Sequence, residues 1–141
     1  MRIYLCDLIH SSFVTKEIEN VIPLNIGLIA AYTKEMLEGS VDITLFKYPE
    51  KLIAALENDL PDVIGFSCYV WNQELVLFTA KKIKERNPDI LILFGGPNID
   101  GSEEALTSFL KKYQWVDYCI PYEGEEPFAS LIKAYINVRS I

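Results

Sequence analysis

Short apolar runs alternate with longer amphipathic stretches along the chain, and this alternation repeats five times. Residues 63–66 are apolar without a polar residue at every second position, which favours a parallel strand covered on both faces. The stretches between the runs carry apolar residues at helical spacing, as Leu52, Leu56 and Leu60 do. We therefore predict strands at residues 3–8, 41–47, 62–67, 90–94 and 116–120, and helices at residues 24–38, 49–60, 73–86, 103–113 and 127–136.

Turn and capping signals support several of these boundaries. Pro23 precedes the first helix, where its missing N–H costs nothing, and Gly39 follows the last turn of that helix. Asn72 is predicted to cap the third helix, and the segment from Asp100 to Glu103 resembles a capping box. The five strand–helix units predict a single domain with an α/β, Rossmann-like (flavodoxin-like) fold. Its doubly wound, five-stranded parallel sheet is expected in the order 2-1-3-4-5.

Composition excludes several classes of protein. The 141 residues include 13 basic and 20 acidic side chains, for a formal net charge of −7. No segment concentrates lysine and arginine as phosphate tracking requires, so a nucleic-acid partner is not expected. Apolar runs fall short of the roughly 18 residues of a membrane span, and Asp7 stands where a signal peptide would stay apolar. Three cysteines, Cys6, Cys68 and Cys119, lie far apart in apolar runs, which favours reduced thiols in a cytoplasmic protein.

Candidate chemistry lies in the loops after strands 1, 3, 4 and 5, because those loops meet at one crevice in such a sheet. The loop after the first strand, residues 9–22, is unusually long and holds the only histidine, His10. The candidate binding residues follow the other three strands: Ser67, Cys68, Tyr69, Val70 and Trp71; Gly95, Gly96, Pro97 and Asn98; and Glu123, Gly124 and Glu125.

Several common ligands lack their motif here. Neither Gly-x-Gly-x-x-Gly nor Gly-x-x-x-x-Gly-Lys-Ser/Thr follows the first strand, which disfavours dinucleotide and nucleoside triphosphate sites. A flavodoxin would need a tight phosphate loop at the same place. A receiver domain would need an aspartate where Ser67 ends the third strand.

Four segments together are similar to one known family. They are residues 23–32, residues 63–67 with Trp71, residues 95–98 and residues 123–128. In this order they resemble the N-terminal cobalamin-binding domain of cobalamin-dependent radical S-adenosylmethionine (SAM) enzymes. The resemblance extends over nearly the whole chain and implies cobalamin (vitamin B12) as the cofactor.

The resemblance also implies roles for the candidate residues. Ser67 would bind the nucleotide tail of cobalamin, and Gly95 and Gly96 would let the tail pass without a side-chain clash. Residues 69–71 would lie against the corrin ring or its amides. The carboxylates of residues 123–125 would accept hydrogen bonds from corrin amides, with Gly124 keeping the backbone close.

Each of these positions also has a purely structural interpretation. Ser67 can form a turn, and the glycine pair can end a strand. Trp71 can anchor a core beneath the third helix. Glu123 and Glu125 can favour a helix N-terminus through its dipole.

Cobalamin domains that ligate cobalt carry Asp-x-His-x-x-Gly after the first strand, and this chain departs from that pattern. Two residues separate Asp7 from His10, and Phe13 stands where the glycine should be. We therefore expect base-off cobalamin without a protein histidine ligand, and no metal-ligating residue in this chain.

The Cys-x-x-x-Cys-x-x-Cys motif of radical SAM enzymes is absent from these residues. S-adenosylmethionine and a 4Fe-4S cluster would then belong to a C-terminal radical SAM barrel of the same polypeptide, since the chain stops just past the fifth helix. The chain would not be catalytic alone. It would position the corrinoid for methyl transfer or related radical chemistry. The alternative is a degenerate domain that keeps the fold without cofactor and serves as a scaffold or partner-docking module.

Overall fold

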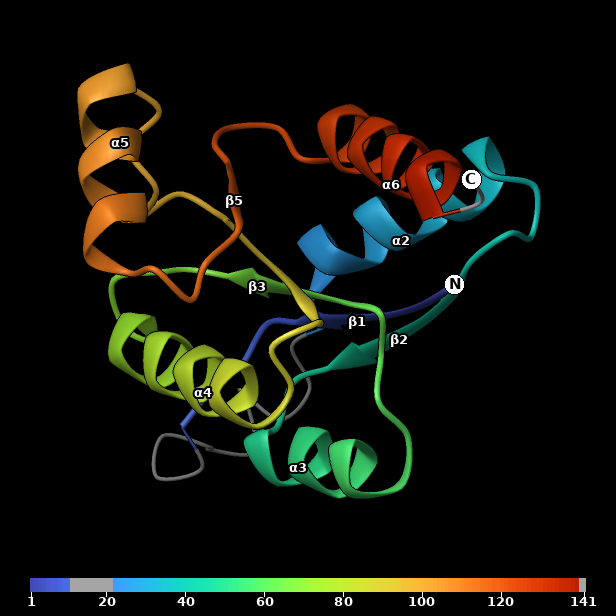
Figure 1. Ribbon diagram of the computed structural model, residues 1–141, viewed down its shortest axis with the longest axis horizontal. Coiled ribbons are helices and arrows are strands. Elements are labelled where there is room, and N and C mark those ends of the chain that lie inside the picture. The colour runs from blue at the N-terminus through green and yellow to red at the C-terminus, as the bar shows by residue number, and fades with distance from the viewer. Residues whose placement is uncertain (11–21, 140–141) are drawn as a thin grey trace.

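The computed structural model describes residues 1–10 and 22–139, and they form one parallel sheet covered by helices on both faces (Figure 1). The strands are β1 (Arg2–Cys6), β2 (Asp42–Phe46), β3 (Val63–Ser67), β4 (Leu91–Gly95) and β5 (Tyr118–Ile120). All neighbours pair in parallel, in the order β2-β1-β3-β4-β5. The predicted fold class and strand order are confirmed.

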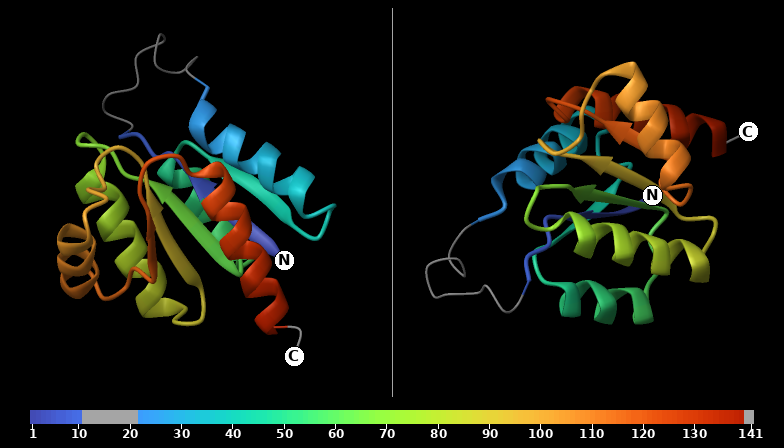
Figure 2. Two further views of the ribbon diagram at one scale, coloured as in Figure 1. Left: turned by 90° about the horizontal axis from the view of Figure 1, so that it is seen from above. Right: turned by 90° about the vertical axis from the view of Figure 1, so that its left-hand side faces the viewer.

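The described residues form five helices: α2 (Leu24–Met36), α3 (Pro49–Asn58), α4 (Gln73–Arg86), α5 (Glu103–Lys112) and, after β5, α6 (Glu125–Arg139). Helices α2 and α6 pack side by side over one face of the sheet, while α3 and α4 lie under the other (Figures 1 and 2). None of the helices in the described ranges is long and apolar enough to cross a membrane.

Alternate side chains of each strand build two separate cores, as the period of two requires. Ile3 and Leu5 of β1 pack in the cluster beneath α2 and α6. Tyr4 and Cys6 pack in the larger cluster on the opposite face, which also includes residues of α3 and α4 and is flanked by α5. The central strand β3 is buried along its whole length, which explains its unbroken apolar run.

Several predicted boundaries shift by a few residues. Strand β5 spans only Tyr118–Ile120, because Val116 is buried in a turn whose N–H bonds to the carbonyl of Tyr113. Helix α6 begins at Glu125, which places Pro127 in the first turn, where a missing N–H is tolerated.

One predicted helix cap lies at the wrong residue, and the other lacks its capping hydrogen bond. The cap of α5 is Ser102, whose Oγ accepts from the N–H of Ala105 at 3.4 Å, while Asp100 accepts from the N–H of Ser102. Asn72 stands at the N-cap position of α4, as predicted, but its side chain makes no capping hydrogen bond, because it bonds to the backbone of Leu8, Ser67 and Tyr69 instead. The long first loop lies mostly in residues 11–21, outside the described residues.

Candidate functional site

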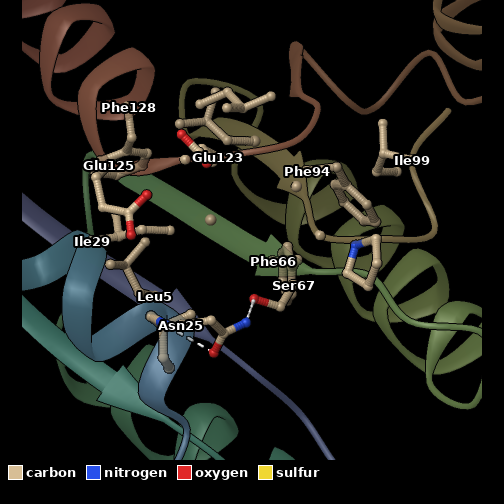
Figure 3. A pocket seen from close by; sticks show the side chains of 18 of the residues that line it. Leu5, Asn25, Ile29, Phe66, Ser67, Phe94, Ile99, Glu123, Glu125 and Phe128 are labelled. Carbon is tan, nitrogen blue, oxygen red and sulfur yellow. Dashed lines mark hydrogen bonds between the residues drawn. The ribbon is translucent and has the colours of Figure 1, made fainter. Parts of the chain in front are cut away.

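A pocket of about 550 Å³ opens at the carboxyl ends of the strands, between the sheet and helices α2 and α6 (Figure 3). Leu5, Gly65 and Leu93 stand in register on β1, β3 and β4 and form its floor. Ile29 of α2 and Phe128 of α6 form apolar walls. A mostly apolar cavity of this size with a few polar groups is typical of small-molecule sites.

The sheet topology explains the position of the pocket. From β1 the chain moves outward to β2, and it then returns to β3 on the other side of β1. Loops therefore diverge at the β1–β3 boundary and leave a crevice at the carboxyl edge, where ligands of doubly wound sheets bind.

A small polar network lies at this edge. Asn25, in the first turn of α2, donates through Nδ2 to Ser67 Oγ at 2.9 Å and to the Tyr69 hydroxyl at 2.7 Å. Its Oδ1 accepts from the N–H of Ile26 at 2.7 Å. Figure 3 shows the Asn25 and Ser67 side chains pointing toward one another across the pocket. Ser67 is the last residue of β3 and is only 6% exposed.

Asn72 holds the loop that carries these hydroxyls. It is 1% exposed, and its Nδ2 donates to the carbonyls of Leu8, at 2.9 Å, and Ser67, at 3.1 Å. Its Oδ1 accepts from the N–H of Tyr69 at 2.8 Å. This one buried side-chain amide therefore joins the segment after β1 to the end of β3, and it fixes the position of the Tyr69 backbone.

Ionisation near the network keeps Tyr69 protonated. Burial raises the pKa of Tyr69, the Asp7 carboxylate raises it further, and the hydrogen bond from Asn25 opposes both. Burial also raises the pKa of Asp7 to about 6, against the opposing charge of Lys47. At neutral pH the Tyr69 hydroxyl can thus donate a hydrogen bond.

Gly95 and Gly96 line the pocket, but Gly96 has a reason of its own to be glycine. Its φ is +99°, and a Cβ there would lie 2.8 Å from the carbonyl oxygen and 2.9 Å from the nitrogen of Cys68. The backbones of these two loops are locked together, since the Cys68 N–H donates to the Gly95 carbonyl at 2.7 Å.

The loop before α6 forms the far side of the pocket. Glu123, Gly124 and Glu125 all line it, and Glu125 lies in the first turn of α6, as an acid favoured there by the helix dipole. A Cβ on Gly124 would lie 2.9 Å from Cδ1 of Ile29, so this glycine allows the loop to approach α2 closely.

Four predicted residues do not line the pocket. Val70 and Trp71 are 78% and 62% exposed, so Trp71 is not a core anchor, and its ring stacks on Tyr69 at 4.5 Å between centroids. Cys68 is fully buried in the cluster on the opposite face. Asn98 is exposed and donates to the side chain of Gln73. Ser67, Tyr69, Gly95, Gly96, Pro97 and residues 123–125 do come together around the pocket.

Burial keeps the three cysteine thiols protonated. Cys6, Cys68 and Cys119 are all free, and burial raises the pKa of each, that of Cys119 to about 11. Within the part of the chain that the structure describes, no group of three His, Cys, Asp or Glu side chains could hold a metal ion. His10 is not among the residues that line the pocket.

Sequence reasoning missed Asn25 and the apolar walls. Asn25 lay inside the matched segment 23–32, but a single asparagine in a helix carries no signal of a contact more than forty positions away. The apolar walls had one signal in the sequence: Leu24 and Leu28 leave α2 without a wholly polar face, which indicates an apolar surface beyond the core.

Comparison with known proteins agrees with this geometry. A family model described as the B12 binding domain matches residues 14–132. The matched residues include strands β2, β3, β4 and β5, helices α2 to α5 and the first part of α6.

Two curated relatives are longer proteins. The chain is 33% identical over 123 residues to the cobalamin-dependent radical SAM methyltransferase TokK of Streptomyces tokunonensis, which covers 82% of this chain and 17% of the relative. It is 29% identical over 116 residues to the 2-(S-pantetheinyl)-carbapenam-3-carboxylate methyltransferase of Streptantibioticus cattleyicolor, covering 79% of this chain and 16% of the relative. The chain thus spans about one sixth of the length of these relatives. Fold, pocket and sequence match agree, and the chain belongs to the B12-binding domain family.

Proposed function

We propose that this chain holds base-off cobalamin for a longer radical SAM enzyme, with the nucleotide tail of the cofactor inserted in the pocket between α2, α6 and the sheet. The pocket carries this proposal, because it lies at the strand ends where a tail could enter and is apolar except at its edge. Its volume, about 550 Å³, suits a nucleotide tail and not a whole corrinoid. The corrin ring would then lie outside, over the loops.

The lining residues fit such a tail. Leu5, Leu93 and Phe128 would pack against its aromatic base, and the Ser67 and Tyr69 hydroxyls would bond to its polar atoms. Gly95, Gly96 and Pro97 would pass beside it with little side-chain bulk. Cys68 and Asn98 would only shape the loop, since they do not reach the pocket.

The exposed residues at the mouth fit the corrin. The stacked rings of Tyr69 and Trp71, 10° from parallel, offer a flat apolar surface, and Val70 extends it. Glu123 and Glu125 on the opposite side would accept hydrogen bonds from corrin amides. Two residues separate Asp7 from His10, and Phe13 stands where the cobalt-ligating motif has its glycine, so no protein histidine would ligate the cobalt.

The enzyme as a whole would use this domain for methyl transfer, as both relatives are named methyltransferases. When bound, cobalamin would supply the methyl group. A C-terminal radical SAM barrel of the same polypeptide, with S-adenosylmethionine and a 4Fe-4S cluster, would be the partner. This chain would contribute positioning of the corrinoid and exclusion of water from its tail.

A cavity-filling variant tests the proposal. Gly65 lies in the pocket floor, and a Cβ there would meet only the flexible end of Leu5, at 2.8 Å, and Phe128, at 3.7 Å. We expect Gly65→Val to keep the fold and to weaken hydroxocobalamin binding by more than about tenfold in a visible-absorbance titration, because burial of the tail is lost. Gly27→Ala is the control, because Gly27 lies in α2 outside the pocket lining and has no atom within 4 Å of the new Cβ, and this variant should bind as the wild type does.

Two outcomes contradict the proposal. Unchanged affinity of a folded Gly65→Val variant means that the tail does not enter this pocket. Absence of wild-type binding at high cobalamin concentration favours the alternative, a domain that keeps the fold as a scaffold or docking module.

A further inference from the structure

Asn25 connects helix α2 to both hydroxyls at the edge of the pocket. One side-chain amide donates to Ser67 Oγ at 2.9 Å and to the Tyr69 hydroxyl at 2.7 Å (Figure 3 draws the first of these). Asn25 is more than forty positions away from Ser67 and Tyr69 in the sequence, and all three residues line the same cavity. This convergence is what a polar binding group in an apolar pocket requires.

The backbone of α2 fixes which way the amide points. The first N–H groups of a helix have no carbonyl in a preceding turn to bond to. The N–H of Ile26 is one of them, and it bonds to Asn25 Oδ1 at 2.7 Å. A flipped amide would set its NH₂ group against this N–H, so the orientation with Nδ2 toward the hydroxyls is favoured.

The orientation decides which way the hydroxyl protons point. The Ser67 and Tyr69 oxygens each accept from Asn25, whose NH₂ group offers them no acceptor in return. Each hydroxyl must therefore direct its own proton away from Asn25, and both residues line the pocket. The raised pKa of Tyr69 keeps that proton in place at neutral pH.

We propose that Asn25 is a positioning residue that makes the Ser67 and Tyr69 hydroxyls hydrogen-bond donors toward an acceptor atom of the nucleotide tail. This inference rests on the proposed function and adds to it the direction of the hydrogen bonds between the protein and the tail. The pocket then favours a ligand segment that accepts hydrogen bonds at this edge. Asn25 causes this preference through its hydrogen bonds to Ser67 and Tyr69.

Asn25→Asp replaces the donating NH₂ group with an accepting carboxylate oxygen and leaves the shape of the side chain almost unchanged. The new carboxylate still accepts from Ile26, and its charge suits a helix N-terminus. It also accepts the protons of Ser67 and Tyr69, which turns them away from the tail. We expect hydroxocobalamin affinity at pH 7 to fall by about 10- to 100-fold, the effect of two lost donors.

Two further readouts separate this role from a merely structural one. Cobinamide lacks the nucleotide tail, so its affinity should be the same in Asn25→Asp and wild type. Cobalamin affinity of the variant should recover as the pH falls and the new carboxyl group takes up a proton, because it can then donate again. Asn58→Asp makes the same exchange on the exposed end of α3, and it should change neither affinity.

Each outcome decides a separate question. Wild-type chain that binds no cobalamin refutes the proposed function. Wild-type binding with equal affinity in a folded Asn25→Asp variant refutes the role of Asn25 alone, as does an equal loss for cobalamin and cobinamide. If Asn25→Asp does not fold, Tyr69→Phe replaces it: cobalamin affinity should fall about fivefold with cobinamide unaffected, and an unchanged cobalamin affinity overturns the inference.

Discussion

At the scale of single residues, buried polar groups carry most of what is specific to this domain. Asn25 and Asn72 each bond to atoms far away in the sequence, and neither partner set follows from local pattern. Ser67 was predicted from its place at a strand end. The asparagines that orient and hold its loop depend on tertiary packing, so only the structure revealed them.

Asn72 should be the more important of the two for stability. Asn72→Ala leaves the Leu8 and Ser67 carbonyls and the Tyr69 N–H without their buried partner. We expect a loss of about 2–3 kcal/mol in the free energy of unfolding, measured by urea denaturation. Asn58→Ala, at an exposed position, should cost under about 1 kcal/mol, and an equal loss in both variants would contradict the assignment.

Asp7 should make stability depend on pH. Its folded pKa of about 6 lies above the unfolded value, so the folded state binds its proton more tightly. The contribution to stability is full below the unfolded pKa, near pH 4, and is lost as the pH rises through about 6.

Asp7→Asn removes this dependence. We expect the variant to be more stable than wild type by about 1–2 kcal/mol at pH 7, after a discount for partial exposure, and equal to it at pH 4. Urea unfolding at a series of pH values measures the difference. A constant difference across the range would mean that Asp7 is not the titrating group.

At the scale of elements, the apolar pattern predicted what depends on burial, and it failed where a boundary depends on a hydrogen bond. The unbroken run of β3 identified the central strand. The cap predicted at Asp100 was wrong, because Ser102 caps α5, and Asn72 takes the N-cap position of α4 without the capping hydrogen bond, because its side chain bonds to backbone groups of Leu8, Ser67 and Tyr69. Which helix pair would cover the pocket was not visible in the pattern, since the sheet order alone does not place side chains.

The loops after β3 and β4 are in close backbone contact at Gly96, and this contact leads to a prediction about stability. Gly96→Ala should lower the free energy of unfolding by about 1–3 kcal/mol without any ligand, because φ is +99° and the new Cβ meets the Cys68 backbone. Gly27→Ala, with no atom within 4 Å of the new Cβ in helix α2, should instead be stabilising by about 0.5–1 kcal/mol. Thermal unfolding of the two variants compares them, and a neutral Gly96→Ala would show that the loops can separate.

At the scale of the whole molecule, the carboxyl edge of the sheet combines the pocket with exposed apolar side chains. The mouth of the pocket carries exposed apolar side chains, among them Leu28, Val70, Trp71 and Tyr122. Such a patch beside a cavity is typical of a ligand or interaction surface. Under the proposed function, the corrin ring would lie on this edge of the sheet, and a second domain would cover the ring.

The most direct test of the account is a map of amide chemical shifts in ¹H–¹⁵N NMR spectra as hydroxocobalamin is added to the chain. The account predicts shifts at the pocket floor, around Gly65 and Leu93, and in the loops after β3, β4 and β5, with no change in α3 on the opposite face. Shifts confined to α3 and α4, or a spectrum that does not change, would contradict it.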